Sequence, residues 1–527
     1  MSRIRPERHR RYRKDQRGFG LKSQWFGRSA AIGQYSTHTH FSVLGVLAFM
    51  LVAIALILLA ALMGASLAIG FWPFAVALVG GVFVLGFYAV LGGRSGPGLR
   101  DSFFWLAFVL IFATDSLKKV TGYSANFVLE FSLILAAPLL VPTLVRLLSE
   151  SRFFKWWFAG LSVFFILSLL SSFFGRSHVF AAAFQFLTNL KFILILLLGF
   201  YIVWSARTEA IFWWIVRWLW LPTAMLVAWQ WGHPSSYFGL MPYATASADP
   251  LQLFPSRAVG PFSHPTYLGL YMGVLTVFCV INAISGAGRR YFVIALCYFL
   301  LLLASAQRQE TVAAIVAATA AVGLLHGKRF ALRSAVIGLV TVLAVGGGAW
   351  LLIKDNLVQE ATKWGVIGHS AIQQPRQVLY IHAVEIADQY APLGSGLGTF
   401  AGAGAQKFDI SLYLDRGFAR YSWFYKQNVL MDTYWTNFLA ETGWAGALLL
   451  LALTLLLVAF TAVNSLEKYP SEIRRFWLLA FGGMAFVFLL SLTSPSFQDP
   501  GLFLVPGIFL GVAYNRMMAW KKPTKRG

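Results

Sequence analysis

The chain has 527 residues, of which 58% are hydrophobic, 16% aromatic and only 12% charged, and its formal net charge is +23. Soluble domains carry about 25% charged residues, so this composition excludes a soluble globular protein and predicts an integral membrane protein. The basic residues are scattered over many loops, which favours an orientation signal and attraction to anionic lipid head groups over nucleic-acid binding.

About fourteen apolar runs approach the length of roughly 20 residues that a helix needs to cross a bilayer. The period-2 alternation of β-barrel strands is absent. We therefore predict an all-α, polytopic helical membrane protein with about 14 transmembrane helices. The runs lie approximately at 42–66, 70–92, 102–117, 127–147, 154–174, 186–205, 210–231, 265–285, 290–306, 309–326, 333–353, 441–463, 475–493 and 499–517.

The distribution of Lys and Arg orients these helices, because cytoplasmic loops carry an excess of basic residues. The tail at 1–40 contains ten basic and two acidic residues, and the tail at 518–527 contains four basic residues. Both tails are therefore predicted to be cytoplasmic, which requires an even number of spans. Successive loops should then lie alternately inside and outside the cytoplasm. The basic loops fall on the cytoplasmic side by this count, except the loop with Lys118 and Lys119, which falls outside.

The predicted organisation has five parts. A basic cytoplasmic tail at 1–40 precedes transmembrane helices 1 to 11 at 41–353, and the only large hydrophilic insertion follows at 354–440. Transmembrane helices 12 to 14 at 441–517 lead to the basic tail at 518–527. A loop as long as 354–440 inside a compact protein is usually functional. We expect this large external loop to contribute to a site.

Arg308 is a charged residue between two apolar segments that are predicted to span the membrane, where a charge is energetically costly. It belongs to the short junction Ser305–Glu310, between the apolar runs 291–304 and 311–325. Charged residues at membrane depth are rare and usually mark a substrate or ion path. The charge pattern places this junction on the outer side, so a cation here indicates an anionic ligand outside the cytoplasm. The alternative is that Arg308 snorkels to the interface and only anchors a helix.

A second outward loop, at 232–264, contains Arg257 and ends at His264. Arginine is permanently charged and can hold phosphate oxygens through two parallel hydrogen bonds, so Arg257 is another candidate ligand for an anion. It could instead orient its loop by capping carbonyl groups. His264 precedes a proline and is expected to have a structural or hydrogen-bonding role. Glu310 is expected to pair with Arg308 or Arg257 and to steady the site.

The large external loop supplies a third arginine. Arg376 opens a predicted helix that runs to Asp388 and also carries Tyr380 and His382. Arg376 is either a further anion ligand or a solvated charge on an exposed helix. His382 is a candidate base, two residues beyond Tyr380.

A glycine turn follows this helix, with Gly394, Gly396 and Gly398 between Pro392 and Phe400. Glycine allows both unusual turn geometry and a close approach to a ligand. Turn geometry is the favoured interpretation, because no helix N-terminus that could bind an anion clearly follows.

The two cysteines, Cys279 and Cys297, lie inside predicted spans and are expected to be small apolar core residues. They allow no disulfide framework. No carboxylate-rich cluster that could bind a metal accompanies the external arginines. We therefore expect neither a metal nor a cofactor.

These segments, in this order, resemble the O-antigen ligase and O-antigen polymerase superfamily of bacterial envelope glycosyltransferases. The resemblance covers roughly residues 250–460 and consists of four short boxes. The family patterns are Arg-x-x-Gly-x-Phe-x-x-Pro, Ser-x-Arg, an arginine before Pro-x-Gly-x-Gly-x-Gly-x-Phe, and His-Asn or Asp-Asn before Glu-x-Gly-x-x-Gly. The first pattern is matched by Arg257, Gly260, Phe262 and Pro265, and the second is matched loosely by Arg308. The third is matched by Arg376 with Pro392–Phe400, and the fourth by Asp432 with Glu441, Gly443 and Gly446.

The resemblance implies a fold similar to the GT-C class and a metal-independent, inverting glycosyltransferase of the bacterial inner membrane, with its active site facing the periplasm. It implies an undecaprenyl-diphosphate-linked oligosaccharide as donor and acceptor, with a chain-length regulator and a flippase protein as further partners. It assigns Arg257, Arg308 and Arg376 to the diphosphate. Ligases carry a catalytic histidine nine residues before the Glu-x-Gly box. Asp432 stands there in this chain, which resembles the polymerase branch.

Asp432 and Glu441 can be compared by helix geometry. In one continuous helix over 432–446, nine residues at about 100° each add to roughly 900°, which puts the two side chains on opposite faces. Asp432 is then the expected base, with His382 in reserve. Asn437 and Glu441 share a face and are expected to lock the helix.

Three functions follow from these observations. The first is polymerisation of lipid-linked repeat units into an exopolysaccharide, capsule or O-antigen. The second is an O-antigen ligase that transfers a finished glycan to lipid A core. The third is a non-enzymatic flippase or exporter of lipid-linked sugar, which should show cations within several spans and two related halves. The candidate residues instead gather at outer helix ends, which favours an enzyme.

Overall fold

The computed structural model describes residues 105, 108, 126–245, 247–249, 254–326, 375–426, 430–431 and 433–521. The regular elements in these ranges are all helices, without a strand, so the all-α prediction is confirmed there. The predicted spans at 42–66, 70–92 and 333–353 and the tail at 1–40 lie outside the described residues, as does nearly all of the span at 102–117.

Eight helices in the described ranges are long and apolar enough to cross a membrane, which confirms a polytopic helical architecture there. They are α6 (Arg152–Phe174), α7 (Val179–Tyr201), α8 with α9 (Ala206–Trp218 and Trp220–Gly232), α11 (Pro265–Ile284), α13 (Arg308–His326), α19 (Tyr434–Leu466), α20 (Ser471–Ser491) and α21 (Pro500–Lys521). Beside them, α12 (Arg290–Ala304) is apolar but shorter, and α5 (Asn126–Glu150) contains two internal prolines. The total of about 14 spans stays a prediction.

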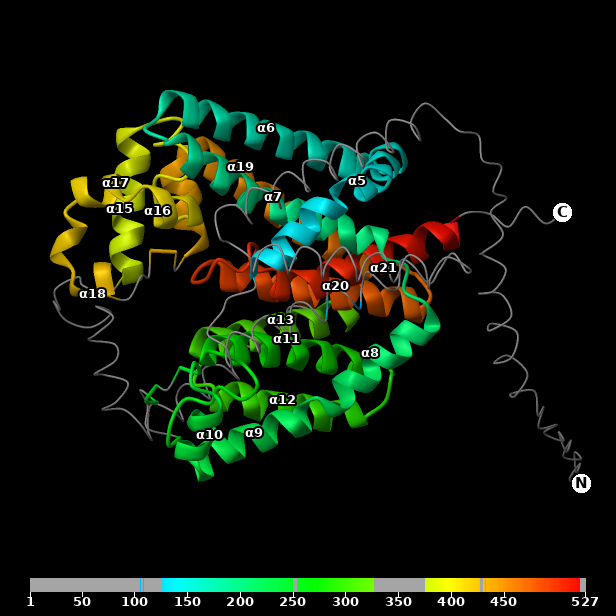
Figure 1. Cartoon of the computed structure of the whole chain (residues 1–527). Coiled ribbons are helices and arrows are strands. Elements are labelled where there is room, and N and C mark those ends of the chain that lie inside the picture. Colours follow the sequence, from blue (N-terminus) through cyan, green and yellow to red (C-terminus); the bar gives the residue numbers. More distant parts are fainter. Residues whose placement is uncertain are drawn as a thin grey trace, which may run out of the picture.

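The helices form two groups on either side of a central pair. Figure 1 shows α20 and α21 through the middle, with α5, α6, α7 and α19 on one side and α9, α11, α12 and α13 on the other. Small residues allow close contact at the centre: Gly507 and Gly511, one helical turn apart on α21, lie against the backbone of α7 near Gly199. A stripe of small residues is a common way for membrane helices to pack closely.

One end of the bundle carries most of its basic residues. The short connections there are Ser151 and the segments 202–205, 285–289 and 467–470. Arg474 holds this end together, because its guanidinium donates to Ser465 O at 3.0 Å and to Leu325 O at 2.6 Å, near the ends of α19 and α13. The basic residues at this end include Arg146, Arg152, Lys155, Arg207, Arg289, Arg290, Lys468, Arg474, Arg475, Arg516 and Lys521. The side of the membrane that this end faces stays a prediction.

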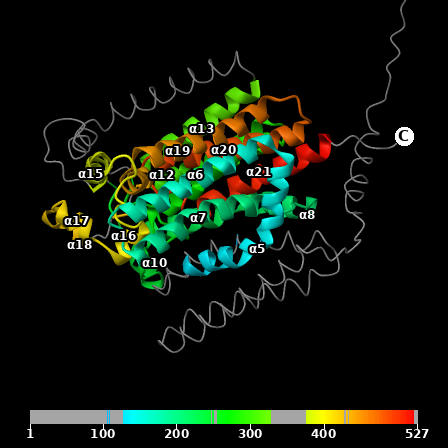
Figure 2. The same ribbon diagram turned by 90° about the horizontal axis from the view of Figure 1, so that it is seen from above.

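The other end is covered by residues 375–426 of the predicted external loop, which we call the cap (Figures 1 and 2). The last residues of the predicted loop belong to α19 instead, because that helix begins at Tyr434 and not at 441. The cap contains α15 (Pro375–Gln389), α16 (Ala403–Phe408), α17 (Ser411–Asp415), η2 (Phe418–Arg420) and α18 (Ser422–Lys426). Its apolar core is separate from that of the bundle and includes Leu379, Ile386, Phe400, Tyr413 and Phe418. The segment is thus a folded layer, and the helix predicted from Arg376 to Asp388 is confirmed.

The cap joins the bundle at a break in α19. Gly443 has φ 63° and ψ −173°, which interrupts the helix, and the freed carbonyl groups of Ala440 and Glu441 need other donors. The amide of Ser395 donates to Ala440 O at 2.9 Å, and the amide of Gly396 donates to Glu441 O at 3.0 Å. The assumption of one continuous helix over 432–446 is therefore wrong, because Gly443 turns the backbone and the glycine turn replaces the helical hydrogen bonds.

The three glycines of the turn have φ values of 83°, 100° and 73°, which only glycine adopts easily. A Cβ on Gly394 would overlap the backbone of Gly443, and one on Gly398 would overlap the carbonyl of Ala181 in α7. The turn therefore packs backbone against backbone. This geometry supports the structural interpretation of Gly394, Gly396 and Gly398.

Candidate functional site

The tight connection between α12 and α13 places charged residues at the capped end. Ser305 N donates to Leu301 O and Leu302 O, and Ala306 has a positive φ of 51°, so the chain reverses within a few residues. Arg308 then begins α13, and Glu310 lies in its first turn. The predicted junction is thus a real helix-to-helix turn, and it brings Arg308, Gln309 and Glu310 to the end of the bundle.

The loop that carries Arg257 lies against this turn. Ala258 N donates to Ala304 O at 2.9 Å, and Nε of Arg257 donates to Ser305 O at 3.3 Å. Gln230 of α9 holds the loop from the other side, because its Nε2 donates to Arg257 O at 3.0 Å and its Oε1 accepts from Val259 N at 2.8 Å. Arg257 therefore does cap a carbonyl, as the structural alternative predicts, and its guanidinium is also fixed in place.

Arg257 lies within electrostatic reach of four other charged residues. Burial lowers the pKa of its guanidinium. The carboxylates of Glu310 and Asp249 act in the opposite direction on this pKa, whereas the positive charges of Arg308 and Arg376 lower it further. These interactions join residues from the loop before α11, from α13 and from the cap in one cluster.

Arg376 belongs to this cluster through α15. Its Nη1 donates to Oε1 of Gln309 at 3.0 Å, and the side chain is half-buried, so it is not a purely solvated charge. Tyr380 lies one turn further on the same face, and its hydroxyl donates to Leu492 O at 2.6 Å. Burial raises the pKa of Tyr380, and the charge of Arg376 opposes that shift. α15 is thus docked on the start of α13 and the end of α20.

The structure therefore places Arg308 and Arg376 within electrostatic reach of Arg257, although the three arginines lie in distant parts of the sequence. Arg308 is exposed at the start of α13. The assignment of the three arginines to a diphosphate stays a prediction. An arrangement of this kind can bind an anionic group, because guanidinium groups supply permanent charge and several donors.

Glu310 is the buried acidic member of the cluster. Its side chain is 3% exposed, and Arg376 and Arg257 interact electrostatically with the carboxylate. Oε2 has no hydrogen-bond partner among the described residues. Glu310 was expected to pair with Arg308 or Arg257. The structure shows an electrostatic interaction with Arg257, but no arginine donates a hydrogen bond to Oε2.

His264 has a structural position. Its Nδ1 accepts from Thr266 N at 3.2 Å and caps α11. Thr266 Oγ1 in turn accepts from Nε2 of Gln307 at 3.2 Å, which ties the start of α11 to the turn before α13. This geometry agrees with the hydrogen-bonding role expected for His264.

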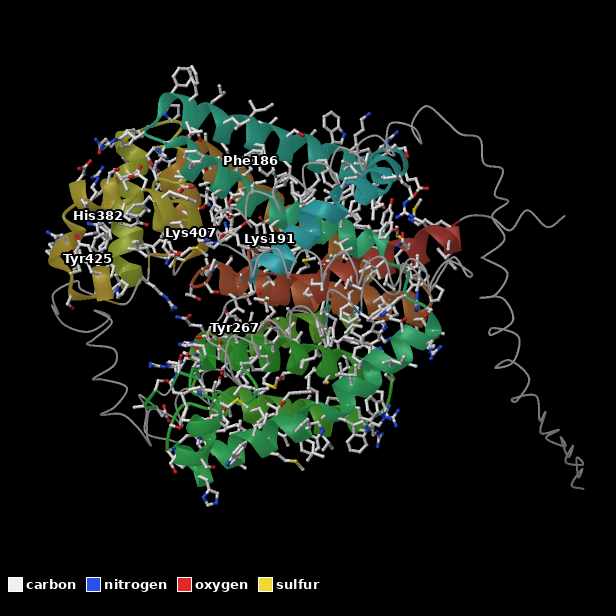
Figure 3. All side chains as sticks on the ribbon, viewed as in Figure 1. Phe186, Lys191, Tyr267, His382, Lys407 and Tyr425 are labelled. Carbon is white, nitrogen blue, oxygen red and sulfur yellow. The ribbon has the colours of Figure 1, made fainter. Side chains whose placement is uncertain are left out.

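His382 lies elsewhere on the cap. Its Nδ1 is 2.8 Å from Oε2 of Glu385, and its ring centroid is 4.9 Å from that of Phe418. Six residues separate it from Arg376, which at about 100° per residue places the two on different faces of α15. In Figure 3, His382 lies on the part of the cap away from Tyr267, which marks the start of α11. The structure thus does not bring His382 to the arginine cluster.

Glu441 lies at the joint between the cap and α19. It is fully buried, and Oε1 accepts from Thr399 N at 3.1 Å and Phe400 N at 3.3 Å. Asn437, on the same face, donates from Nδ2 to Phe400 O at 3.1 Å. The two side chains therefore fix the glycine turn to α19, whereas the sequence predicted that they would lock the helix itself.

A buried amide network continues from this joint and was missed by the sequence reasoning. Nε2 of Gln185 donates to Oδ1 of Asn189 at 2.9 Å and to Oδ1 of Asn437 at 3.3 Å. Nε2 of Gln498 donates to the same oxygen of Asn189 at 3.0 Å. The sequence signal that could have predicted this network is the pair Gln185 and Asn189, four residues apart in the apolar helix α7. Polar side chains inside a membrane helix are costly unless they form hydrogen bonds.

Asp432, the predicted base, lies outside the described residues, so its role stays a prediction. Within the described ranges, no group of three or more His, Cys, Asp or Glu side chains is arranged to hold a metal ion. No protein-family model matches the chain, and neither does any curated protein.

Proposed function

We propose that this protein is a membrane glycosyltransferase that polymerises polyprenyl-diphosphate-linked oligosaccharide repeat units into a surface polysaccharide. The observation that carries the proposal is the meeting of Arg257, Arg308 and Arg376 at the capped end of an apolar helical bundle. A lipid diphosphate keeps its chain in the membrane and its charge at the membrane surface. A cluster of arginines at the end of a bundle suits that group, because guanidinium binds phosphate oxygens in pairs.

The proposed chemistry is a single displacement. A hydroxyl oxygen of the acceptor glycan attacks the anomeric carbon of the donor. The bond between that carbon and the diphosphate oxygen breaks, and the diphosphate leaves with the electron pair. The arginines stabilise the negative charge that develops on the leaving group, a contribution that is usually the largest single one in such reactions. One displacement inverts the anomeric configuration.

The site is proposed to face the outside of the bacterial inner membrane, with both chain termini in the cytoplasm. A chain-length regulator and a flippase protein are proposed to act with the enzyme. Polymerisation is favoured over ligation because Asp432 stands where the resembling ligases carry histidine. A ligase would use the same donor and arginines but transfer the glycan to lipid A core.

The test is an assay with purified protein in lipid nanodiscs and an undecaprenyl-diphosphate-linked oligosaccharide, with and without lipid A core. We expect a ladder of longer polyprenyl-linked glycans with the wild type and its loss with Arg308→Gln. Transfer to lipid A core without a ladder would contradict polymerisation and identify a ligase. Movement of the lipid across the bilayer without a new glycosidic bond would identify a flippase.

A further inference from the structure

The carboxylate of Glu310 is buried beside two arginines and yet is incompletely hydrogen-bonded. Its side chain is 3% exposed, and Oε2 lacks a hydrogen-bond partner among the described residues. An unsatisfied buried polar atom is costly, and the cost is greater for a charged group. Such an atom in a native structure calls for an explanation, and a catalytic role is one of those known.

The neighbouring arginines are anchored without help from Glu310. Arg257 donates from Nε to the carbonyl oxygen of Ser305, and Arg376 donates from Nη1 to Oε1 of Gln309. Both positive charges act on the carboxylate of Glu310 electrostatically. The carboxylate is therefore not needed to orient these two contacts, and its buried Oε2 keeps an unused hydrogen-bond acceptor beside the arginines.

Asp249, Glu441 and His382 are less suitable proton acceptors for a reaction at the arginines. Asp249 acts on Arg257, but its Oδ2 already accepts a hydrogen bond from Phe254 N at 3.0 Å. Glu441 also has an Oε2 without a hydrogen-bond partner among the described residues, but its Oε1 receives two backbone amides and fixes the glycine turn to α19. His382 is paired with Glu385 on another face of α15. Glu310 alone among these lies within electrostatic reach of both Arg257 and Arg376.

We infer that Glu310 is the general base of the reaction and receives the acceptor hydroxyl, an inference that rests on the proposed function. The hydroxyl donates its hydrogen bond to Oε2 of Glu310. As its oxygen forms a bond to the anomeric carbon of the donor, the proton passes to Oε2. The bond from that carbon to the diphosphate breaks, and the diphosphate takes the electron pair. Glu310 ends the step protonated and later releases the proton to water.

The first experiment compares Glu310→Gln with wild type in single-turnover transfer from an undecaprenyl-diphosphate-linked oligosaccharide. Glutamine keeps the shape but cannot accept the proton, so we expect a loss of about 10²–10⁴ in rate. Donor affinity should change by no more than about threefold, which corresponds to less than 1 kcal/mol. Asp388→Asn is the matched control, because Asp388 is an exposed carboxylate on α15 that bonds Trp444. We expect it to keep the wild-type rate.

Chemical rescue separates a base from a residue that only supports the fold. In Glu310→Ala, added formate should restore part of the rate, because it can accept the proton in place of the missing carboxylate. Azide should attack the anomeric carbon in place of the acceptor hydroxyl, without needing a base, and yield a glycosyl azide of inverted configuration as the diphosphate leaves. Glu310→Asp, which keeps the carboxylate, should retain more activity than Glu310→Gln. If a variant fails to fold, as judged by its thermal unfolding, the remaining two still decide the question.

Two results would overturn the inference while leaving the proposed function intact. One is a Glu310→Gln protein with the wild-type rate, particularly if Asp432→Asn is inactive. The other is a variant whose donor affinity falls while its rate at saturating donor is unchanged, which would make Glu310 a counter-charge for the arginines. A wild-type protein that forms no glycosidic bond from the lipid-linked donor would instead overturn both the inference and the proposed function.

Discussion

Arg376 in the cap donates a hydrogen bond of 3.0 Å to the side-chain oxygen of Gln309, 67 residues earlier in the chain. This contact docks α15 on the first turn of α13 and places the Arg376 guanidinium within electrostatic reach of Arg257 and Glu310. The cap therefore contributes Arg376 to a charged cluster whose other members belong to the bundle and its loop. The proposed function depends on that completion, since two of the three arginines belong to the bundle and its loop and one belongs to the cap.

The planar fork of Arg376 is expected to matter beyond its charge. Arg376→Lys keeps the charge but loses the paired donors, so we predict a loss of roughly tenfold to hundredfold in polymerisation rate. Arg420→Lys is the control, because Arg420 is exposed on the cap and its guanidinium donates to the hydroxyl of its neighbour Tyr421. The measurement is the initial rate of ladder formation. Equal rates for Arg376→Lys and wild type would remove Arg376 from the anion site.

The joint between cap and bundle is predicted to tolerate no side chain at Gly394. A Cβ there would overlap the backbone of Gly443, and its φ is 83°. Gly417 has a similar φ of 71°, but the described residues leave open space where its Cβ would lie, so Gly417→Ala isolates the cost of the backbone conformation alone. That cost is about 1 kcal/mol. We predict that Gly394→Ala lowers the thermal unfolding temperature in detergent clearly more than Gly417→Ala, and equal shifts would contradict the close packing.

The buried amide network should contribute to stability. Oδ1 of Asn189 accepts hydrogen bonds from both Gln185 and Gln498. Asn189→Leu leaves both donors without this partner, and we predict a destabilisation of about 1–3 kcal/mol, read as a lower unfolding temperature. Thr188→Val is a suitable comparison, because the hydroxyl of Thr188 donates to the carbonyl of Phe184 in its own helix. A network that matters should make the first variant clearly less stable than the second.

The two ends of the bundle are predicted to face opposite sides of the membrane. Tyr425 is 66% exposed on the cap, and Lys468 is exposed at the basic end. In a background without Cys279 and Cys297, a membrane-impermeant thiol reagent applied to intact cells or spheroplasts should label Tyr425→Cys and not Lys468→Cys. The reverse pattern would invert the orientation derived from the basic loops, and equal labelling would reject it.

Much of the fold could be predicted from hydropathy, because a span is a local property. The apolar runs at 265–285, 475–493 and 499–517 correspond closely to α11, α20 and α21. The turn at Arg308 and the helix beginning near Arg376 were also visible in the sequence. That this turn and this helix lie close together was inferred only from a family resemblance. The contact between Arg376 and Gln309 joins two distant segments, so no local pattern in the sequence predicts it.

The joint of the cap could not be predicted from local pattern. The break at Gly443 depends on donors from Ser395 and Gly396, which satisfy the freed carbonyl groups. Without those donors, an apolar segment with isolated glycines is expected to continue as a helix. The unsatisfied oxygen of Glu310 was equally hidden, because it depends on where Arg257 and Arg376 find their other partners.

The most direct test of the central claim is the binding of undecaprenyl diphosphate to the purified protein, compared with undecaprenol of the same chain length. Both lipids share the apolar tail, so a difference between them reports the anion site. We predict that the diphosphate binds at least about tenfold more tightly, a difference of about 1.4 kcal/mol, and that Arg257→Gln, Arg308→Gln and Arg376→Gln each reduce this preference. Equal affinity for the two lipids in the wild type would contradict an anion site at the arginine cluster.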